Sequence, residues 1–570
     1  MARRPALDRY WWPSSDLPLA SVDARTKVAQ LAIEASAPPF GLAPSGGGWL
    51  KWKESMWVEN TLQYLDEPGE WVLDTKTRRL YLWPPQGAPG KDIFAPRLRE
   101  LIRVEGSIDS EGPTDEPVRN LVFRGLAFTQ GDRYTKEHDW KGWGIQHAWE
   151  LFDRGTALVR FRGAEDCAVE ECRFYNSGGT AVRLDLHCQR ITIARNLIDH
   201  VGQMGIFLCG YGPGTKDVNR NNRIVSNHIH HCGEIRWDAV AICAWQSGSN
   251  RIAHNLIDHC PRQAIAISGV RNPSFDRSRA CPESGRTIRW HELPPSVSEG
   301  HYWRRVIPFL HARDNMDNMV EGNEIYRVIE KLGDGAAINI SGAGEGNVIR
   351  RNYIHDLFNT DAVAGIRTDG WQSGTLITEN ILYRCAVSGI QLKNRNHIEN
   401  NILVDTRRGC IAFDQFPEDE AVGGARIRHN IFYDSRDQAR FYRYSPRLFP
   451  DINAPSASLA DQNLFYTAAN PAWSKNYLGE LRKEGIERHS VAVDPLFLDV
   501  ENGNFRLQAE SPAFSMGFKP FDTSAIGLLP EMPERLARRG TDERVDDFKP
   551  WRLGTRPTTF ADESNGSGTH

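Results

Sequence analysis

Aspartate, lysine, arginine and amide side chains recur at equivalent points of short segments in the second half of the sequence. The segment Gly-Ile-Arg-Thr-Asp ends at Asp369, and the next segment of this kind, Gly-Ile-Gln-Leu-Lys, ends at Lys393. Asp334 lies three residues before another such segment, which starts at Ala337. Two carboxylates can divide acid and base work between them, and nearby cations decide which one is ionised. Such side chains also suit a ligand with many hydroxyl groups.

Eight segments share one pattern: a small residue, an aliphatic residue, any residue, an apolar residue, and a fifth residue that is usually polar. They are Ala181–Asp185, Gly205–Cys209, Ala241–Trp245, Ala264–Ser268, Ala337–Ser341, Gly365–Asp369, Gly389–Lys393 and Cys410–Asp414. Alternation with a period of two is typical of a strand with one buried face. Because the second and fourth residues are aliphatic, we expect them to point inward and the third and fifth to point outward.

A second repeat places an asparagine before two mostly apolar residues. Its members are Asn196, Asn227, Asn255, Asn323, Asn352, Asn380, Asn401, Asn430 and Asn463, at steps of 31, 28, 68, 29, 28, 21, 29 and 33 residues. Most of these steps are too short to hold a crossover helix, so they predict coils of short strands that pair in parallel. Asparagine tolerates the left-handed conformation of turns, and stacked asparagines can hydrogen-bond to one another. The expected fold is all-β: a single-stranded, right-handed parallel β-helix, which is a solenoid.

The repeats divide the chain into three parts. The expected parts are an N-terminal strand-rich capping segment at 1–117, the β-helix at 118–524 and an irregular C-terminal tail at 525–570. The long step between Asn255 and Asn323 predicts one insertion, at 271–312. Because it leaves its coil just after Ser268, the insertion either stands beside the outward columns as a wall or only anchors itself to the coils.

Outward side chains at equal positions should stack into columns, because neighbouring coils lie ~4.8 Å apart. The candidate substrate-binding residues on and beside these columns are Asp238, Trp245, Asn339, Asp361, Arg367, Trp371, Gln391, Lys393 and Asp414. Carboxylates and amides bond hydroxyl groups, and either tryptophan could stack on a sugar ring. For any single residue, solubilising the outside of a sheet is the competing interpretation. Together they favour a side groove that binds carbohydrate.

Charge and composition exclude several other classes. The formal net charge is −4 and the basic residues are spread along the chain, which argues against a nucleic-acid partner. No stretch approaches the ~18 apolar residues of a membrane span, and the opening residues lack a signal peptide's apolar core. The ten cysteines form no Cys-x-x-Cys pair, so buried free thiols are expected. His230 and His231 are more typical of structural histidines than of metal ligands, and neither a metal nor a cofactor is predicted.

Four segments resemble parts of β-helical glycoside hydrolases. Segments 57–85 and 494–528 are similar to the stretches that precede and close the coils of these proteins. Segments 333–341 and 365–380 are similar to their Asp-x-Gly-Ala-Ile and Gly-Ile-x-x-Asp strands. The resemblance is closest to the proteins around glycoside hydrolase family 141 and covers roughly 50–528. It implies a glycosidase acting on a plant or algal glycan, in an extracytoplasmic (periplasmic or secreted) location.

The resemblance also implies that Asp334 and Asp369 are the catalytic pair. Glycoside hydrolysis typically uses two carboxylates, ~5–5.5 Å apart for retention or ~6.5–9.5 Å for inversion. Register raises a difficulty, because Asp334 precedes its strand whereas Asp369 ends the next one. One solution is a chain that curls before Ala336. A second is Asp334 with Asp361 on adjacent coils, and a third is Asp369 with Asp414, two coils apart.

The cations near the pair bear on its roles and on the alternatives. Positive charge favours an ionised carboxylate, so Arg367 and Lys393 would keep Asp369 ionised. Asp334 then becomes the expected acid. A polysaccharide lyase would instead use Lys393 or Arg367 to remove a proton beside a uronate, with or without calcium held by aspartates. A non-catalytic carbohydrate-binding protein would need no carboxylate pair.

Overall fold

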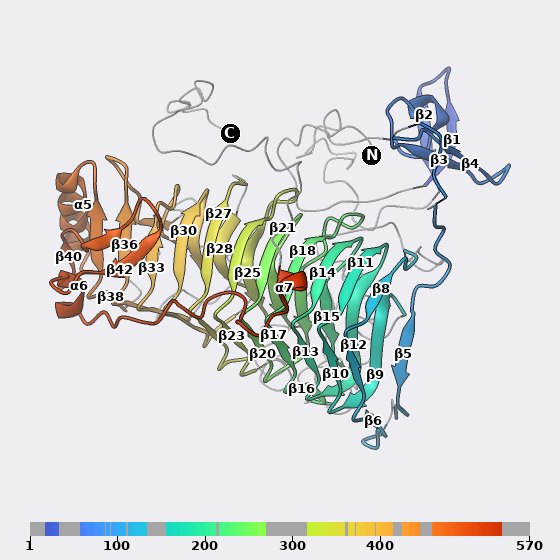
Figure 1. The fold of residues 1–570 in the computed structure, drawn as a ribbon. Coiled ribbons are helices and arrows are strands. Elements are labelled where there is room, and N and C mark those ends of the chain that lie inside the picture. Colours follow the sequence, from blue (N-terminus) through green and yellow to red (C-terminus); the bar gives the residue numbers. More distant parts are fainter. Residues whose placement is uncertain are drawn as a thin grey trace, which may run out of the picture.

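The computed structural model describes most of the chain. The described ranges are 18–32, 58–85, 87–91, 93–109, 112–133, 155–211, 216–269, 316–359, 363–370, 372–393, 395–413, 425–444 and 459–537. Within them the chain winds through three long parallel sheets, and the coils stack along one axis (Figure 1). None of the helices in these ranges has the length and apolar character needed to cross a membrane.

The three sheets are numbered in the order in which each coil visits them. Sheet I contains β7 (Val122–Arg124), β10 (Ala168–Glu170), β13 (Thr192–Ala194), β17 (Arg223–Val225), β20 (Arg251–Ala253), β23 (Met319–Glu321), β26 (Val348–Arg350), β29 (Leu376–Thr378), β32 (His397–Glu399), β35 (Arg426–Arg428) and β38 (Leu459–Asp461). Sheet II contains β8 (Ala127–Thr129), β11 (Arg173–Ser177), β14 (Leu197–Val201), β18 (His228–Cys232), β21 (Leu256–Cys260), β24 (Glu324–Val328), β27 (Tyr353–Leu357), β30 (Ile381–Cys385), β33 (Ile402–Val404), β36 (Ile431–Asp434), β39 (Leu464–Thr467) and β40 (Val491–Ala492). Sheet III contains β5 (Ile102–Glu105), β9 (Ala157–Glu165), β12 (Thr180–Gln189), β15 (Ile206–Cys209), β19 (Ile242–Trp245), β22 (Ile265–Ser268), β25 (Gly335–Ser341), β28 (Val363–Asp369), β31 (Ser388–Leu392), β34 (Ile411–Phe413) and β37 (Tyr442–Tyr444), with β6 (Val118–Arg119) and β16 (Asn219–Arg220) paired to its first strands.

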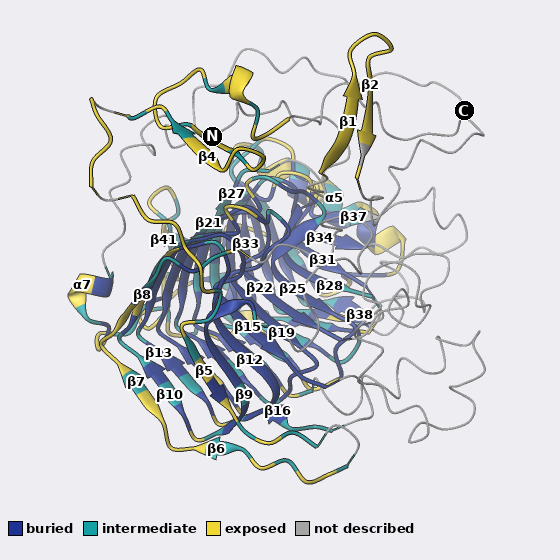
Figure 2. Cartoon of the chain, turned by 90° about the vertical axis from the view of Figure 1, so that its right-hand side faces the viewer, coloured by how far each residue is buried: buried dark blue, intermediate teal, exposed yellow. Residues whose placement is uncertain are grey.

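The core fills the inside of the coils (Figure 2). In sheet III the second-position isoleucines stand in register and are fully buried: Ile206, Ile242, Ile265, Ile338, Ile366, Ile390 and Ile411. β-Branched side chains suit strands, and burying each one contributes about 1.5–3 kcal/mol. The nine cysteines within the described ranges are buried and free, as predicted.

The asparagines form one continuous ladder at the turn between sheets I and II, as predicted. From Asn196 to Asn430, Nδ2 of each donates to Oδ1 of the next at 2.8–3.0 Å. The ladder ends on the buried carboxylate of Glu487, which accepts from Nδ2 of Asn463 at 3.1 Å. The left-handed conformation falls on the residue before each asparagine, for example Arg195 with φ 58°. The predicted backbone role of asparagine is therefore wrong, and its contribution is hydrogen bonding between coils.

A second asparagine ladder, which the sequence interpretation missed, lies at the turn from sheet III to sheet I. The backbone N–H of Asn222, Asn250 and Asn318 each donates to Oδ1 of the next member at 2.9–3.1 Å, and the series ends at Asn347. Each of these residues directly precedes a sheet I strand, so the signal was present in the sequence. Two of the three turns are thus held by repeated amides. The third turn, from sheet II to sheet III, is the one that carries Asp334.

The first end of the β-helix lies before its predicted boundary. β5 pairs in parallel with β9, so sheet III begins at Ile102 instead of after residue 117. The elements beyond that end are the hairpin β1 (Leu19–Asp23)–β2 (Val28–Leu31), the short 3-10 helix η1 (Leu62–Tyr64) and the hairpin β3 (Trp71–Asp74)–β4 (Arg79–Leu82) (Figure 1). The elements at the opposite end are α5 (Pro471–Lys483), the hairpin β41 (Phe497–Asp499)–β42 (Asn504–Leu507) and α6 (Pro512–Ser515).

After α6 the chain runs back along the coils (Figure 1), where an irregular tail was expected. The N–H of Gly527 donates to the carbonyl of Gly322 at 2.8 Å. Further along, α7 (Glu534–Ala537) packs Leu536 against Leu197. The part of the tail that follows α7 lies outside the described residues.

The insertion separates two adjacent coils, as its position predicts. β20, β21 and β22 pair directly with β23, β24 and β25. The chain therefore departs after Ser268 and has re-entered the next coil by Met319. Residues 271–312, and with them the expected wall, lie outside the described residues.

Candidate functional site

The register of sheet III is the one predicted from the sequence. Arg367 pairs with Asn339 on one side and Gln391 on the other, so these third-position side chains form one column. Asp369 ends β28, two residues after Arg367, and Lys393 directly follows β31. Because the isoleucines between these residues point into the core, the polar side chains lie on the outer side of three successive coils.

Asp334 joins this group because the chain bends just before β25. Its backbone has a φ of 49°, which is the left-handed conformation. Oδ1 of Asp334 lies 2.6 Å from Nη1 of Arg367, and Oδ2 of Asp369 lies 3.4 Å from Nη2 of the same guanidinium. The chain therefore curls before Ala336, as one of the three solutions expects. The other two solutions depend on Asp361 and Asp414, which lie outside the described residues.

One guanidinium bridges the two carboxylates. Because both carboxylates contact the same guanidinium, their bound oxygens lie closer together than ~9.5 Å, the upper limit for the separation of the two carboxyl groups in an inverting glycosidase. The side chains of Asp334 and Asp369 are 23% and 15% exposed, so solvent reaches both. Two carboxylates from adjacent coils thus share one guanidinium, and both are partly open to solvent.

Three basic side chains lie beside this pair. Nζ of Lys393, which is almost fully buried, lies 2.6 Å from Oδ1 of Asp369. On the other side, Nη2 of Arg262 donates to the backbone carbonyl of Asp334 at 3.3 Å. Arg367 is the third of these side chains. Ammonium and guanidinium groups suit a ligand that is anionic or rich in hydrogen-bond acceptors.

The pKa of the Asp334 carboxyl bears on its predicted role as the acid. Burial by itself raises the pKa of the Asp334 carboxyl, but the adjacent Arg367 guanidinium outweighs burial and, with Arg262, holds that pKa below its usual range. A general acid at neutral pH needs the opposite shift. The direction of this shift does not favour the acid role expected for Asp334, and that role stays a prediction.

Two buried amides beside the pair have polar atoms without hydrogen-bond partners among the described residues. They are Nδ2 of Asn339 and Oε1 of Gln263, whose side chain packs against Gly335 at the start of β25. A buried polar atom without a partner costs about 1–3 kcal/mol, so such atoms mark places where a ligand can supply the bond. The sequence analysis missed Gln263 and Arg262. Their signal was their place directly before a sheet III strand, which Asp334 shares.

Two of the predicted binding residues lie apart from this group. Trp245 is 1% exposed and packs with Phe207 in an apolar cluster, so it offers no open face to a sugar ring. Asp238 is buried, lies 3.2 Å from Nε of Arg236, and lines a separate small pocket that also contains Arg183. The predicted residues outside the described part of the chain are Asp361, Trp371 and Asp414.

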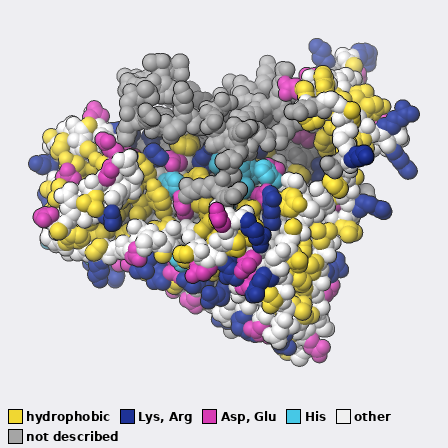
Figure 3. All heavy atoms as spheres, viewed as in Figure 1, with side chains coloured by type: hydrophobic (Ala, Val, Ile, Leu, Met, Phe, Trp, Pro, Cys, Tyr) yellow, Lys and Arg dark blue, Asp and Glu magenta, His cyan; other side chains and the backbone are white. Residues whose placement is uncertain are grey.

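A second cluster of ionisable side chains lies on sheet II. Figure 3 shows histidines at the surface near β18 and β21. Nδ1 of His230 lies 2.8 Å from Nδ1 of His231, and His200 on the preceding coil stacks on His231 with ring centres 4.7 Å apart. Burial and the positive charge of neighbouring histidines lower the pKa of both His230 and His231 to about 4. These rings are therefore neutral near pH 7.

The comparisons with known proteins bear on the fold. A family model described as a right handed beta helix region matches residues 155–285 and 308–447. With the strand pairing, this match defines a right-handed parallel β-helix protein. A search of curated proteins finds no match.

Several solved structures are similar to this chain. A glycoside hydrolase is similar at 16% identity with a TM-score of 0.48, and the alignment covers 72% of this chain and 68% of that chain. A mannuronic acid specific polysaccharide family 6 lyase from human gut microbiota has 12% identity and a TM-score of 0.32, over 66% and 87% of the chains. The tailspike protein of E. coli bacteriophage HK620, in complex with a pentasaccharide, has 11% identity and a TM-score of 0.30, over 58% and 55%.

Proposed function

We propose that this protein is a glycoside hydrolase that cleaves a plant or algal polysaccharide or oligosaccharide with Asp334 and Asp369. The observation that carries the proposal is that one guanidinium holds both carboxylates, from two adjacent coils, within the spacing of a glycosidase pair. The resemblance of 333–341 and 365–380 to strands of the proteins around glycoside hydrolase family 141 supports it. We place the chain in that group as part of the same proposal.

The nearby cations bear on the roles of the two aspartates. Arg367 favours the ionised form of Asp334, which suits the nucleophile of a retaining enzyme or the base of an inverting one. Asp369 lies close to two cations, with Oδ1 2.6 Å from Nζ of Lys393 and Oδ2 3.4 Å from Nη2 of Arg367. These ion pairs favour the ionised form of both carboxylates, so they assign the role of proton donor to neither. Lys393 is a positioning residue for Asp369.

Asparagine variants of each aspartate test the pair, because they keep the shape of the side chain and remove its titration. With a substrate found by a reducing-end screen of plant and algal glycans, Asp334→Asn and Asp369→Asn should each lose about 10²–10⁴-fold in turnover while remaining folded. Asp434→Asn is the matched control. Asp434 likewise lies close to an arginine, with Oδ2 2.6 Å from Nη2 of Arg436, but it is buried and belongs to sheet II. Near-normal turnover of Asp369→Asn would contradict the proposal.

A polysaccharide lyase is the second candidate, and the position of Arg367 and Lys393 beside the two aspartates is the observation that favours it. In a lyase, an arginine of this group would neutralise the carboxylate of a bound uronate. Neutralisation makes the adjacent carbon acid easier to deprotonate, and Lys393 in its neutral form would take that proton. An unsaturated product absorbs in the ultraviolet, whereas hydrolysis releases reducing ends without such absorbance. Measuring both signals on uronate-rich glycans separates the two functions.

A further inference from the structure

We propose that His200, His230 and His231 form a binding site for a divalent transition metal ion, such as Zn²⁺, between two adjacent coils. The site is on sheet II, two coils before the coil that carries Asp334. It does not depend on the proposed hydrolase function. It departs from the expectation that these histidines are only structural.

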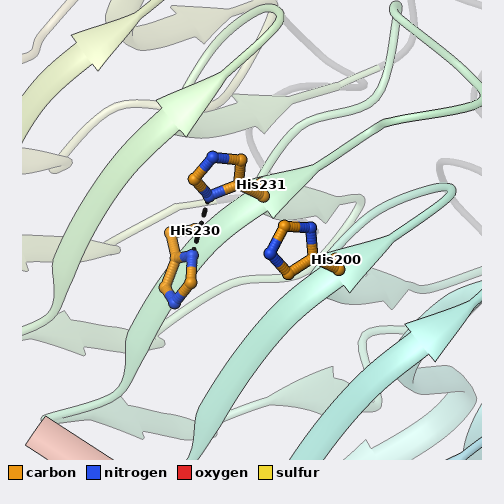
Figure 4. A group of neighbouring side chains, drawn as sticks. All are labelled: His200, His230 and His231. Atoms are coloured by element: carbon orange, nitrogen blue, oxygen red, sulfur yellow. Dashed lines mark hydrogen bonds between the residues drawn. The ribbon is translucent and has the colours of Figure 1, made fainter. Parts of the chain in front are cut away.

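The geometry brings three ligands from two strands to one point. His200 belongs to β14, and His230 and His231 belong to β18, which pairs with β14 in parallel. One ring nitrogen from each histidine lies within 4.8 Å of the other two. Figure 4 shows a ring nitrogen of His200 turned toward the other two rings. Zinc binds imidazole nitrogen at ~2.0–2.1 Å, which places two ligands of one ion roughly 3.3 Å apart, so small ring movements complete the site.

Neighbouring side chains fix the orientation of the histidine rings, as they do around the histidine ligands of metal sites. Nδ1 of His200 lies 2.9 Å from Oε1 of Glu234, so Nε2 is the nitrogen that faces the cluster. A carboxylate on the far nitrogen of a ligating histidine fixes its tautomer and orientation. Ring stacking on His259, with centres 4.9 Å apart, holds His231 in place. His259 is in turn held by Asp258, at 2.5 Å.

The cluster is also accessible to an ion. His200 and His231 are partly exposed, whereas His230 forms the buried floor. A site with three protein ligands keeps a position for water or another ligand, as open zinc sites do. Imidazole suits zinc, copper, nickel and iron more than magnesium or calcium. Binding would replace the contact between the two Nδ1 atoms of His230 and His231 with two bonds to the ion.

Metal titration of the full chain tests the site. Stripped protein is titrated with CoCl₂, followed by the visible absorption of the bound ion, and with ZnCl₂, followed by the thermal midpoint of unfolding. We expect saturable binding that weakens at least ten-fold in His200→Ala and in His231→Ala, and a rise in the midpoint with ZnCl₂ that both variants lose. His489→Ala is the matched control, because His489 is an exposed histidine paired with Asp461, far along the chain, and it should bind as the wild type does.

A measurement on the unaltered protein guards against variants that fail to fold. Zn²⁺ should protect His200 and His231 from acylation by diethyl pyrocarbonate, read by mass spectrometry, and should leave His489 reactive. Unchanged Co²⁺ affinity in both folded variants would overturn the proposal. Equal modification of His200 and His231 with and without Zn²⁺ would do the same, and the cluster would then be a hydrogen-bonded stack only.

Discussion

The outer face of sheet III has two halves that share one register and differ in chemistry. On β15, β19 and β22 the third positions are Phe207, Cys243 and Ala266, all buried. On the next coils, β25 and β28, the same position holds Asn339 and Arg367. The backbone of the two halves is equivalent, because every pair of neighbours stands in register. The difference lies in the side chains alone.

The comparison teaches that the repeat determines where a side chain points, whereas its chemical type determines what it does there. In the apolar half, Trp245 and Phe207 join residues of the preceding turns in a second hydrophobic cluster, separate from the core inside the coils. In the charged half, Arg367 is shared by two partly exposed aspartates, and its neighbour Asn339 has an unpartnered amide nitrogen. The apolar half thus adds buried hydrophobic contacts, whereas the charged half holds ion pairs and a buried amide nitrogen without a partner among the described residues.

Truncating the tryptophan of the apolar half should have the largest effect on stability. Trp245→Ala removes a side chain that is 1% exposed, so we expect a loss of about 3–5 kcal/mol in the free energy of unfolding. Denaturant unfolding measures it. Trp71→Ala is the control, since Trp71 is 59% exposed on β3 and should change stability by less than about 0.5 kcal/mol. A stable Trp245→Ala protein that has lost glycan binding would break the comparison, because it would place Trp245 in the site.

Removing the shared guanidinium should destabilise the charged half. Arg367→Met leaves Asp334 without its ion-pair partner, which should cost about 3 kcal/mol, the lower end of the range for buried pairs because Asp334 is partly exposed. The double variant Arg367→Met/Asp334→Asn should recover part of that loss, since no charge is then stranded. Equal stability of the single and double variants would show that the guanidinium does not hold Asp334.

The stability lost in the Arg367→Met variant should depend on pH. Arg367 lowers the pKa of Asp334 in the folded protein, so the stabilisation is fully present above the ordinary value of 3.8. It is lost as the pH falls through the lower, folded-state value. The stability gap between wild type and Arg367→Met should therefore be constant near neutral pH and narrow below about pH 4. Unfolding curves at a series of acidic pH values measure the gap.

The fold was predictable because the repeat carries its own physical signal. The asparagine ladder and the alternating isoleucines recur at nearly equal spacing, and each coil must repeat the backbone geometry of the last. The register of Asn339, Arg367 and Gln391 followed from that spacing alone. The second ladder, through Asn222 and Asn250, carried the same kind of signal and was overlooked.

The site was less predictable because it depends on the turn from sheet II to sheet III, which carries neither of the two asparagine ladders. The bend at Asp334 comes from one residue in the left-handed conformation, which an aspartate adopts only occasionally. Arg367 and Arg262 lower the pKa of Asp334, and Arg262 lies 72 positions earlier in the chain. The burial of Trp245 likewise depends on turn residues that pack over sheet III. Contacts between residues this far apart in the chain cannot be read from the spacing of the repeat.

The smallest expected effect on stability comes from replacing Asn339, a buried asparagine of the charged half that belongs to neither asparagine ladder. Asn339 is 1% exposed, and its Nδ2 has no partner among the described residues. Asn339→Leu removes that buried donor and keeps most of the volume, so stability should change by less than about 1 kcal/mol, or rise. Asn323 is equally buried but bonded on both sides of the ladder. Asn323→Leu should cost about 2–3 kcal/mol, because it leaves its neighbours' amides unpaired.

Comparing the two leucine variants therefore distinguishes a hydrogen bond that forms in the free protein from one that forms only with a bound ligand. On a substrate of the proposed hydrolase, Asn339→Leu should raise KM about ten-fold, the equivalent of one lost hydrogen bond at ~1.4 kcal/mol. Asn323→Leu should leave KM unchanged in the folded fraction. If Asn339→Leu proves as destabilising as Asn323→Leu, the amide is already satisfied in the free protein. The charged half would then be built for stability, as the apolar half is, and the contrast between them would lose its functional meaning.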